Sequence, residues 1–189
     1  MGSNKVFLIH GRNHQAKEEF KKFLLSLNLN PIDTEYVRRC LPAPVTILDL
    51  VINGMKLSDY VVALFTGDEW SVLRPEFREA SDVDEGRWQA RPNVIFEAGL
   101  AYGQAPERMI FVKLGGVELF SDTAGLHEFR PTNDYAINQP RHTLREALKK
   151  WFFENTGFEI PENENWKTEG DFEKVVPRRS RPLDPFLPT

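Results

Sequence analysis

The segment Asp59-Tyr-Val-Val-Ala-Leu-Phe-Thr66 decides the fold of this chain, because all residues between its two ends are apolar. A strand that is apolar on both faces is typical of the centre of a parallel sheet that helices cover on each side. The short apolar runs Lys5–Ile9 and Met109–Leu114 predict two further buried strands. Leu29–Glu35 predicts a weaker fourth strand.

Helical patterns separate these strands. Apolar residues recur at helical spacing over Ala16–Leu27, where Asn13 is the predicted N-cap, and over Val45–Met55 and Thr143–Phe153. The inward-facing residues expected in the last two helices are Leu48, Val51, Ile52 and Met55, and Leu144, Ala147, Leu148, Trp151 and Phe152. Arg91–Gly103 predicts a further helix that is apolar on almost every side. Strands that alternate with helices predict an α/β fold with a parallel sheet between two helical layers.

Several segments lack any periodicity. Those predicted to be loops are Val37–Pro44, Gly67–Ala90 and Val117–Asp134, the last with one short strand near Leu126–Phe129. Beyond Gly157, prolines punctuate a polar stretch with few aliphatic residues. We therefore expect one domain over residues 5–156, followed by a proline-rich tail or linker over residues 157–189.

The composition excludes several classes of protein. The 189 residues carry a net charge of −4, so no large positively charged surface for binding duplex nucleic acid is expected. No apolar run approaches the ~20 residues of a membrane span, and we expect no signal peptide before the first predicted strand. Cys40 is the only cysteine, which excludes an internal disulfide and a Cys-rich zinc site and fits a reducing cytoplasm.

Glu97 is the one charged residue between Val94 and Tyr102. At helical spacing it shares a stripe with Val94, Leu100 and Ala101. An ionised carboxylate among apolar neighbours costs free energy unless a partner compensates it. Two interpretations stay open. Glu97 is a catalytic residue, or it lies on the helix edge and pairs with a loop arginine.

A carboxylate in such surroundings can stabilise positive charge. Cleavage of a glycosidic bond passes through an oxocarbenium-like state that a nearby carboxylate stabilises. Most glycosidases also need an acid to protonate the leaving oxygen, but nicotinamide leaves NAD⁺ as a neutral pyridine. One glutamate therefore suffices for NAD⁺ cleavage. Burial would raise the pKa of Glu97, and a nearby Arg12 or Arg91 would lower it.

Ligands of open parallel sheets bind outside the carboxyl ends of the strands, which His10–Asn13, Thr66–Trp70 and Gly115–Gly116 follow here. Gly11 would let a ligand approach the backbone, Arg12 could clamp a diphosphate, and the helix N-terminus that follows attracts phosphate. An ordinary strand-to-helix turn would have the same sequence, since the Walker A and Rossmann glycine patterns are absent from it.

Other residues near these strand ends each allow two interpretations. Trp70 and Trp88 could stack on nicotinamide or adenine, or they could pin the long loop to the domain. Asp68 could bind ribose hydroxyls or be a solvated loop charge. His10 and His14 are four residues apart, but a strand end and a helix start do not share a face, so no metal site is expected.

Four blocks, in this order, resemble a known family. They are Lys-Val-Phe-Leu-Ile-His-Gly-Arg-Asn (5–13), Val-Val-Ala-Leu-Phe-Thr-Gly-Asp-Glu (61–69), Arg-Pro-Asn-Val-Ile-Phe-Glu-Ala-Gly (91–99) and Phe-Val-Lys-Leu-Gly-Gly-Val-Glu-Leu (111–119). Over roughly residues 5 to 155 the chain resembles the TIR-like domain of bacterial nucleotide-binding proteins. This branch of the Toll/interleukin-receptor fold serves as the effector in cyclic-nucleotide anti-phage defence.

The resemblance implies a flavodoxin-like three-layer sandwich that hydrolyses NAD⁺ to nicotinamide and ADP-ribose, or to a cyclised ADP-ribose. NAD⁺ is then a substrate, and neither a cofactor nor a metal is expected. The family's catalytic glutamate falls on Glu97, and its substrate-binding loops fall on His10, Gly11, Arg12 and Asn13 and on Thr66 and Asp68. The second of these loops reads Thr-Gly-Asp-Glu where relatives often have Thr-Pro-Asp-Asp. Arg91, as a phosphate or carboxylate partner, and Trp70, as a stacking wall, complete the candidate site.

Family members usually carry a second domain that senses a cyclic oligonucleotide and drives the TIR domains into filaments. The resemblance therefore implies self-association through TIR–TIR contacts, and a sensor domain in cis or in trans. Two other functions fit the residues. One is a non-catalytic TIR module that binds nucleotide or another TIR domain through the basic loop Tyr36–Val45. The other is a nucleoside deoxyribosyltransferase-like enzyme, whose related fold uses one glutamate as a covalent nucleophile.

Overall fold

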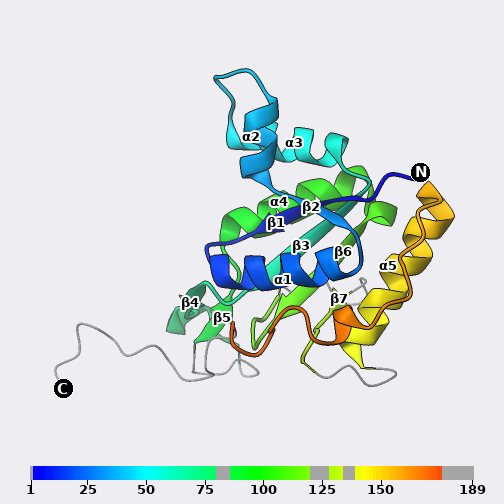
Figure 1. The fold of residues 1–189 in the computed structure, drawn as a ribbon. Helices are drawn as coiled ribbons and strands as arrows, with labels where there is room; N and C mark the ends of the chain where they lie inside the picture. The colour runs from blue at the N-terminus through cyan, green and yellow to red at the C-terminus, as the bar shows by residue number, and fades with distance from the viewer. Residues whose placement is uncertain (1, 80–85, 120–127, 134–138, 176–189) are drawn as a thin grey trace.

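A five-stranded sheet forms the centre of the molecule, with the order β2-β1-β3-β6-β7 (Figure 1). The computed structural model describes residues 2–79, 86–119, 128–133 and 139–175. The strands are β1 Lys5–His10, β2 Asn30–Ile32, β3 Tyr60–Thr66, β6 Met109–Leu114 and β7 Glu128–Phe129. Neighbouring strands of this sheet all pair in parallel, which confirms the predicted parallel α/β sheet.

The central strand is β3, and all of its residues are buried. Ala63 of β3 lies opposite Ile9 of β1 on one side and opposite Phe111 of β6 on the other. From β1 the chain passes to the edge strand β2 and then returns to β3, so the strand order reverses between β1 and β3. Doubly wound sheets bind ligands at such a switch point. The carboxyl ends of β1 and β3 are therefore where a site is expected.

Helices cover both faces of the sheet (Figure 1). On one face lie α1 (His14–Ser26) and α5 (Pro140–Thr156), and on the other lie α3 (Ile47–Leu57) and α4 (Pro92–Gln104). Successive side chains of a strand point to opposite faces, so Val6 and Leu8 pack with α1 whereas Phe7 and Ile9 pack with α3 and α4. This is the predicted three-layer sandwich.

The predicted loop Val37–Pro44 was wrong in its first half, because a short helix, α2, spans Thr34–Cys40. Asp33 caps this helix by accepting a hydrogen bond from the backbone N–H of Tyr36 at 3.0 Å. The prolines that suggested a loop follow the end of the helix, where proline is common. In the segment Tyr36–Val45, which was predicted to be a basic loop, the residues up to Cys40 are therefore helical.

Two helices bury their predicted faces only in part, because Val51 and Met55 of α3 and Val94 and Ala101 of α4 are buried and other residues expected inside are not. The buried residues of α3 are Leu50, Val51, Gly54 and Met55. Leu48 was expected to face inward but is exposed, so this prediction was wrong by part of a turn. On α4 the fully buried residues are Val94, Ala98 and Ala101, and Phe96 is 65% exposed. The helix is therefore not buried all round, because it covers the sheet with one stripe only.

Residues 158–175, which were expected to belong to a tail or linker, pack against the domain. Ile160, Trp166, Phe172 and Val175 are buried beside α1 and α5. Their irregular spacing produces neither a helical nor a strand pattern, so hydrophobic periodicity does not predict their burial. Residues 176–189 of the predicted tail lie outside the described residues.

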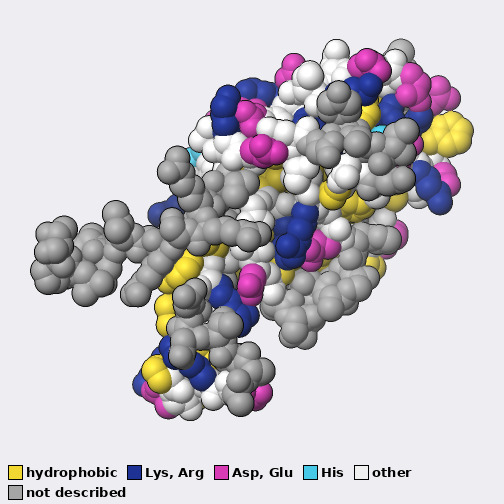
Figure 2. Space-filling model, turned by 90° about the horizontal axis from the view of Figure 1, so that it is seen from below, with side chains coloured by type: hydrophobic (Ala, Val, Ile, Leu, Met, Phe, Trp, Pro, Cys, Tyr) yellow, Lys and Arg dark blue, Asp and Glu magenta, His cyan; other side chains and the backbone are white. Residues whose placement is uncertain are grey.

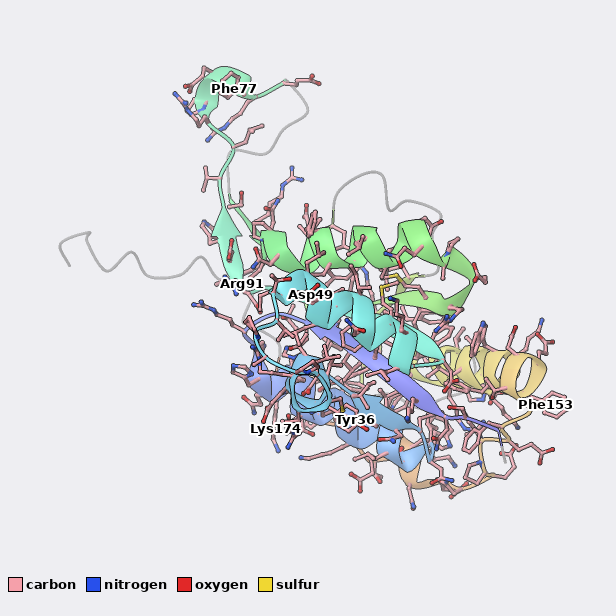
Figure 3. The ribbon with its side chains drawn as sticks, turned by 90° about the horizontal axis from the view of Figure 1, so that it is seen from above. Tyr36, Asp49, Phe77, Arg91, Phe153 and Lys174 are labelled. Atoms are coloured by element: carbon pink, nitrogen blue, oxygen red, sulfur yellow. The ribbon has the colours of Figure 1, made fainter. Side chains whose placement is uncertain are left out.

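The predicted loop Gly67–Ala90 contains a hairpin of two short antiparallel strands, β4 (Glu69–Ser71) and β5 (Arg87–Gln89). The chain between them extends away from the body as far as a 3-10 turn at Pro75–Phe77 (Figure 3). Residues 80–85 lie outside the described residues. The short strand predicted near Leu126–Phe129 is β7, and residues 126 and 127 are also outside the described part.

The surface carries charges of both signs. On the face seen in Figure 2, Lys and Arg side chains alternate with Asp and Glu side chains among the described residues. Within the described ranges, none of the helices has the length and apolar character that crossing a membrane requires.

Asp33 is a buried carboxylate that links α1 to α2. It is 4% exposed, and it accepts a hydrogen bond from Lys21 Nζ at 2.8 Å, with Lys17 Nζ at 3.4 Å. Burial alone would raise the pKa of this carboxyl. The hydrogen bonds from Lys21 and from the backbone N–H of Tyr36, together with the two ammonium charges, outweigh burial and hold the pKa far below its usual range.

We expect Asp33→Asn to lower the free energy of unfolding at pH 7 by about 1–3 kcal/mol, because asparagine keeps the cap and loses the charge interaction. The carboxyl's pKa is lower in the folded than in the unfolded chain, so its stabilisation is present above about pH 4 and is lost as pH falls through the folded pKa. Urea unfolding of both proteins at pH 7 and pH 2.5 measures this. An equal difference at the two pH values would contradict it.

Candidate active site at the carboxyl end of the sheet

Asp68 joins the two loops at the switch point. Its Oδ2 accepts a hydrogen bond from the backbone N–H of Arg12 at 2.6 Å, and its Oδ1 accepts one from the Thr66 hydroxyl at 2.6 Å. A Cβ on Gly11 would lie 1.9 Å from Asp68 Oδ2, so glycine is what allows this approach. The structure thus brings together Gly11, Arg12, Thr66 and Asp68, as predicted for the two loops. The Asp68 carboxylate is engaged by the protein itself and is not a solvated loop charge.

We expect Gly11→Ala to lower the free energy of unfolding by about 1–3 kcal/mol, because the new methyl group would displace a hydrogen-bonded carboxylate. Gly103→Ala is the matched control. A Cβ at Gly103 on α4 meets nothing within 4 Å, and alanine favours helix, so this change should stabilise by about 0.5–1 kcal/mol. Urea unfolding of the two variants compares them. Equal effects of the same sign would contradict the close approach of Gly11 and Asp68.

His10 and Asn13 have mainly structural contacts. Burial lowers the pKa of His10, and the hydrogen bond from its Nδ1 to Gly11 O at 2.8 Å partly offsets this. Asn13 is the N-cap of α1, as predicted, and its Nδ2 donates to Val175 O at 3.0 Å. The His10 and His14 rings lie 6.2 Å apart, so the expectation that they point to different faces was wrong. The described residues contain no group of three or more side chains suited to a metal ion.

Trp70 and Trp88 pack on each other across the hairpin, with ring centroids 5.2 Å apart. Trp88 Nε1 is buried and has no hydrogen-bond partner among the described residues. The hairpin also contacts the loop after β6, because Trp88 O accepts from the backbone N–H of Glu118 at 3.0 Å and Arg87 Nη1 lies 2.9 Å from Glu118 Oε2. The two rings therefore hold the two strands of the hairpin together, and the contacts of the hairpin with the domain come from the Trp88 backbone and the Arg87 side chain.

The part played by Glu118 was not predicted. The strand-end rule predicts a site at Gly115–Gly116, and Glu118 follows two residues later. The available signal was the apolar Val117 directly after the glycines, which the structure buries.

Two arginines of the candidate site differ in their contacts. Arg91 is the N-cap residue of α4, and its Nε lies 3.2 Å from Glu69 Oε1 at a partly exposed position. Arg12 is exposed, and among the described residues no carboxylate pairs with its guanidinium. The guanidinium of Arg12 is thus available to a ligand.

Glu97 lies on the flank of α4, beside its buried stripe. Tyr102 occupies the opposite flank and packs on Phe111 of β6, with ring centroids 5.9 Å apart, so Glu97 faces the side toward α3. Its carboxylate is half-buried and has no hydrogen-bond or ion-pair partner among the described residues. Burial raises the pKa of Glu97, and the nearby charge of Arg91 lowers it in part. The predicted stripe with Val94 and Ala101 is confirmed, but Glu97 is at its edge rather than enclosed.

These features fit a ligand site at the carboxyl end of the sheet. The half-buried Glu97 carboxylate is carried by α4, which packs against β1 and β3, and Asp68 joins the loops that follow these two strands. The charge of Arg91 lowers the pKa of Glu97 in part. Groups with shifted pKa values at such positions are candidates for chemistry. The arrangement can stabilise a developing positive charge and hold an anionic group nearby.

Comparison with known proteins agrees with this fold. The family model described as the TIR domain of the CAP12/Pycsar effector protein matches residues 5–133. A search of curated proteins found no match. The matched segment contains all three central strands, both loops of the switch point, and the helix that carries Glu97. The chain therefore belongs to the family of TIR domains found in CAP12/Pycsar effector proteins.

Proposed function

We propose that the chain cleaves NAD⁺ to nicotinamide and ADP-ribose, with Glu97 as the essential carboxylate. The observation that carries this proposal is the half-buried Glu97 side chain, which has a raised pKa and no partner among the described residues. A protein has little structural use for such a group, because its desolvation is not compensated by any contact. The charge becomes favourable when a cation forms beside it.

In the proposed reaction the bond between the ribosyl C1′ and the nicotinamide nitrogen breaks, and the electron pair leaves with nicotinamide. Glu97 stabilises the positive charge that develops on the ribosyl carbon. Water then adds to C1′ and loses a proton, which gives ADP-ribose. Attack by an adenine nitrogen in place of water would give the cyclised product. Arg12 and the N-terminus of α1 bind the diphosphate, and Gly11 and Asp68 keep the two loops in place for it.

In the setting of its family, we propose that this activity is the output of an anti-phage effector, with NAD⁺ depletion as its result. A sensor of cyclic oligonucleotides, in cis or in trans, would then switch the domain on by promoting TIR–TIR self-association. Assembly is therefore expected to raise the rate, and the activity per molecule is expected to increase with protein concentration.

The test incubates the full chain with NAD⁺ over a wide range of protein concentrations and follows nicotinamide by chromatography. A parallel reaction contains a deoxynucleoside and a different free base. Nicotinamide release without base exchange supports the proposal. Base exchange would instead support the deoxyribosyltransferase-like reaction. Intact NAD⁺ with saturable NAD⁺ binding would contradict the proposal and support a non-catalytic nucleotide-binding module.

A further inference from the structure

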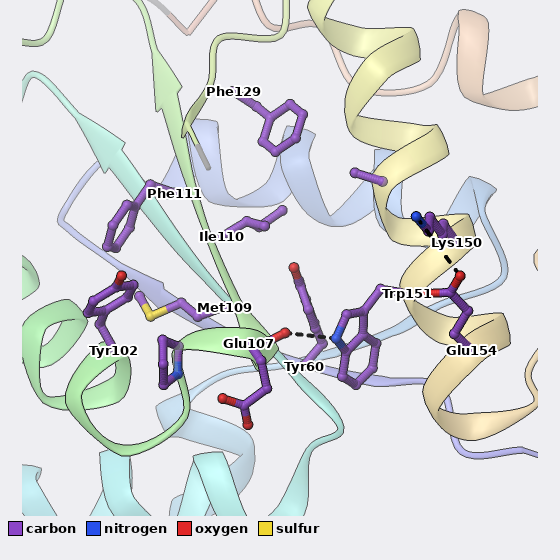
Figure 4. A pocket seen from close by; sticks show the side chains of 12 residues that line it. Tyr60, Tyr102, Glu107, Met109, Ile110, Phe111, Phe129, Lys150, Trp151 and Glu154 are labelled. Atoms are coloured by element: carbon purple, nitrogen blue, oxygen red, sulfur yellow. Dashed lines mark hydrogen bonds and ion pairs between the residues drawn. The ribbon is translucent and has the colours of Figure 1, made fainter. Parts of the chain in front are cut away.

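A pocket lies at the amino end of the sheet, opposite the end where Asp68 and the start of α4 lie. Tyr60 and Met109, which begin β3 and β6, line it together with Tyr102 of α4 and Trp151 of α5 (Figure 4). Its volume of ≈ 560 Å³ lies within the range of small-molecule sites. The proposed reaction at Glu97 makes no use of it.

Aromatic rings form two walls of this pocket. Tyr60 and Trp151 pack with ring centroids 4.6 Å apart, and Tyr102 and Phe111 pack with centroids 5.9 Å apart. The indole N–H of Trp151 donates to Glu107 O at 2.8 Å, which fixes the orientation of the ring. Because these rings are already fixed in orientation, they lose little conformational entropy when a ligand binds. The walls are therefore preorganised for a flat molecule.

The Tyr60 hydroxyl is a polar group without a partner inside the pocket. The residue is 5% exposed, and no donor or acceptor among the described residues bonds to its hydroxyl. Figure 4 shows the hydroxyl pointing into the space between the walls. Burial raises the pKa of Tyr60, so the group is a neutral phenol at physiological pH. Because the hydroxyl faces the pocket and no described protein group bonds to it, it can form a hydrogen bond with the polar edge of a ligand.

The rim of the pocket carries a net negative charge. Lys150 Nζ lies 4.0 Å from Glu154 Oε1, so these two charges largely cancel. The Glu107 side chain also lines the pocket, and its carboxylate has no partner among the described residues. An anion would therefore meet repulsion at the rim, whereas a cation would be attracted by Glu107 and by the faces of the aromatic rings.

We propose that this pocket binds a small planar aromatic molecule, neutral or positively charged, whose polar edge forms a hydrogen bond with the Tyr60 hydroxyl. The rings of Trp151 and Tyr102 contact its faces, and Glu107 selects against a negative charge. The site is separate from the one proposed for NAD⁺ cleavage, so its occupation is measured by binding and does not depend on that activity.

The test uses benzamide, benzamidine and benzoate, which have the same ring and differ in charge. The chain has four tryptophans, so its indole N–H signals can be resolved by NMR. Each compound is titrated into the full chain while the Trp151 indole signal is followed, with Trp166 as an internal control. We expect saturable shifts at Trp151 for benzamide and benzamidine and binding of benzoate that is weaker by about fivefold or more. No saturable shift at Trp151, or tightest binding of benzoate, would overturn the proposal.

Two variants complete the test. Tyr60→Phe removes only the hydroxyl and should weaken benzamide binding by about fivefold to tenfold without a loss of stability. Ala147→Phe, also at the lining, should fill the pocket and abolish the shift. Phe153→Ala on the exposed side of α5 should bind like the wild type. Unchanged affinity in Tyr60→Phe would show that the hydroxyl does not contact the ligand and would overturn the proposal.

Discussion

Glu97→Gln is expected to lower the rate of nicotinamide release from NAD⁺ by about 100- to 1,000-fold, the range seen when one preorganised electrostatic group is removed from a site. Glutamine has almost the same shape and lacks the negative charge that would stabilise the cation. The carboxylate has no folded-state partner among the described residues and its desolvation is unfavourable, so the free energy of unfolding should not fall by more than about 0.5 kcal/mol and could rise. Initial rates and urea unfolding of the same preparation measure both quantities.

Glu118→Gln is the matched control for this variant. Glu118 lies at the same end of the sheet, but its carboxylate is paired with Arg87 at 2.9 Å. We expect its removal to change the rate by less than about threefold, because a paired and exposed carboxylate contributes little to charge stabilisation. Similar losses in the two variants would contradict a specific role of Glu97 and indicate a general effect of negative charge.

Arg141→Ala is expected to have the largest effect on stability. Arg141 is 1% exposed and donates to Trp166 O at 2.9 Å and to Gly170 O at 3.1 Å, with its guanidinium over the rings of Phe172 and Phe23 at 4.7 and 5.4 Å. Burial lowers the pKa of Arg141 to about 10, so the group is still charged at pH 7. Its loss leaves buried carbonyl groups without donors and a cavity between α5 and residues 165–172. We expect a loss of about 3–5 kcal/mol in the free energy of unfolding.

Arg130→Ala serves as the control, because the Arg130 side chain is 59% exposed and pairs only at the surface with Glu128. Its effect should be below about 1 kcal/mol. Urea unfolding of both variants gives the comparison, and limited proteolysis locates the damage. In Arg141→Ala, cleavage should begin within residues 158–175 because that segment loses its anchor. Equal stability of the two variants would contradict the structural role of Arg141.

The main elements of the fold could be predicted because their patterns are local. The apolar run of β3, the flanking strands β1 and β6, and the cap at Asn13 each follow from a few neighbouring residues. The segment 158–175 could not be predicted in this way. Its burial depends on Arg141 of α5, whose guanidinium donates hydrogen bonds to backbone carbonyl groups of this segment. Contacts of that kind leave no periodic pattern.

The candidate site was predictable in outline and not in its details. The rule for strand ends located both loops, and a lone glutamate in an apolar helix located Glu97. The contact of Gly11 with Asp68 could not be foreseen, because it depends on how closely β1 and β3 approach after the sheet has formed. The exposure of Phe96 was missed for the same reason, since composition cannot tell which stripe of a helix meets the sheet.

The most direct test of the account is the pH dependence of kcat/KM for nicotinamide release from NAD⁺, measured from about pH 4 to pH 9. The proposed reaction requires one ionised carboxylate and no acid to protonate the leaving group. Activity should therefore fall on the acid side, with an inflection above the ordinary glutamate pKa of about 4.3, and should stay level on the alkaline side. The charge of Arg91 lowers the pKa of Glu97, so in Arg91→Gln the inflection should move to higher pH. A second inflection on the alkaline side, or an acid inflection that Arg91→Gln leaves in place, would contradict the account.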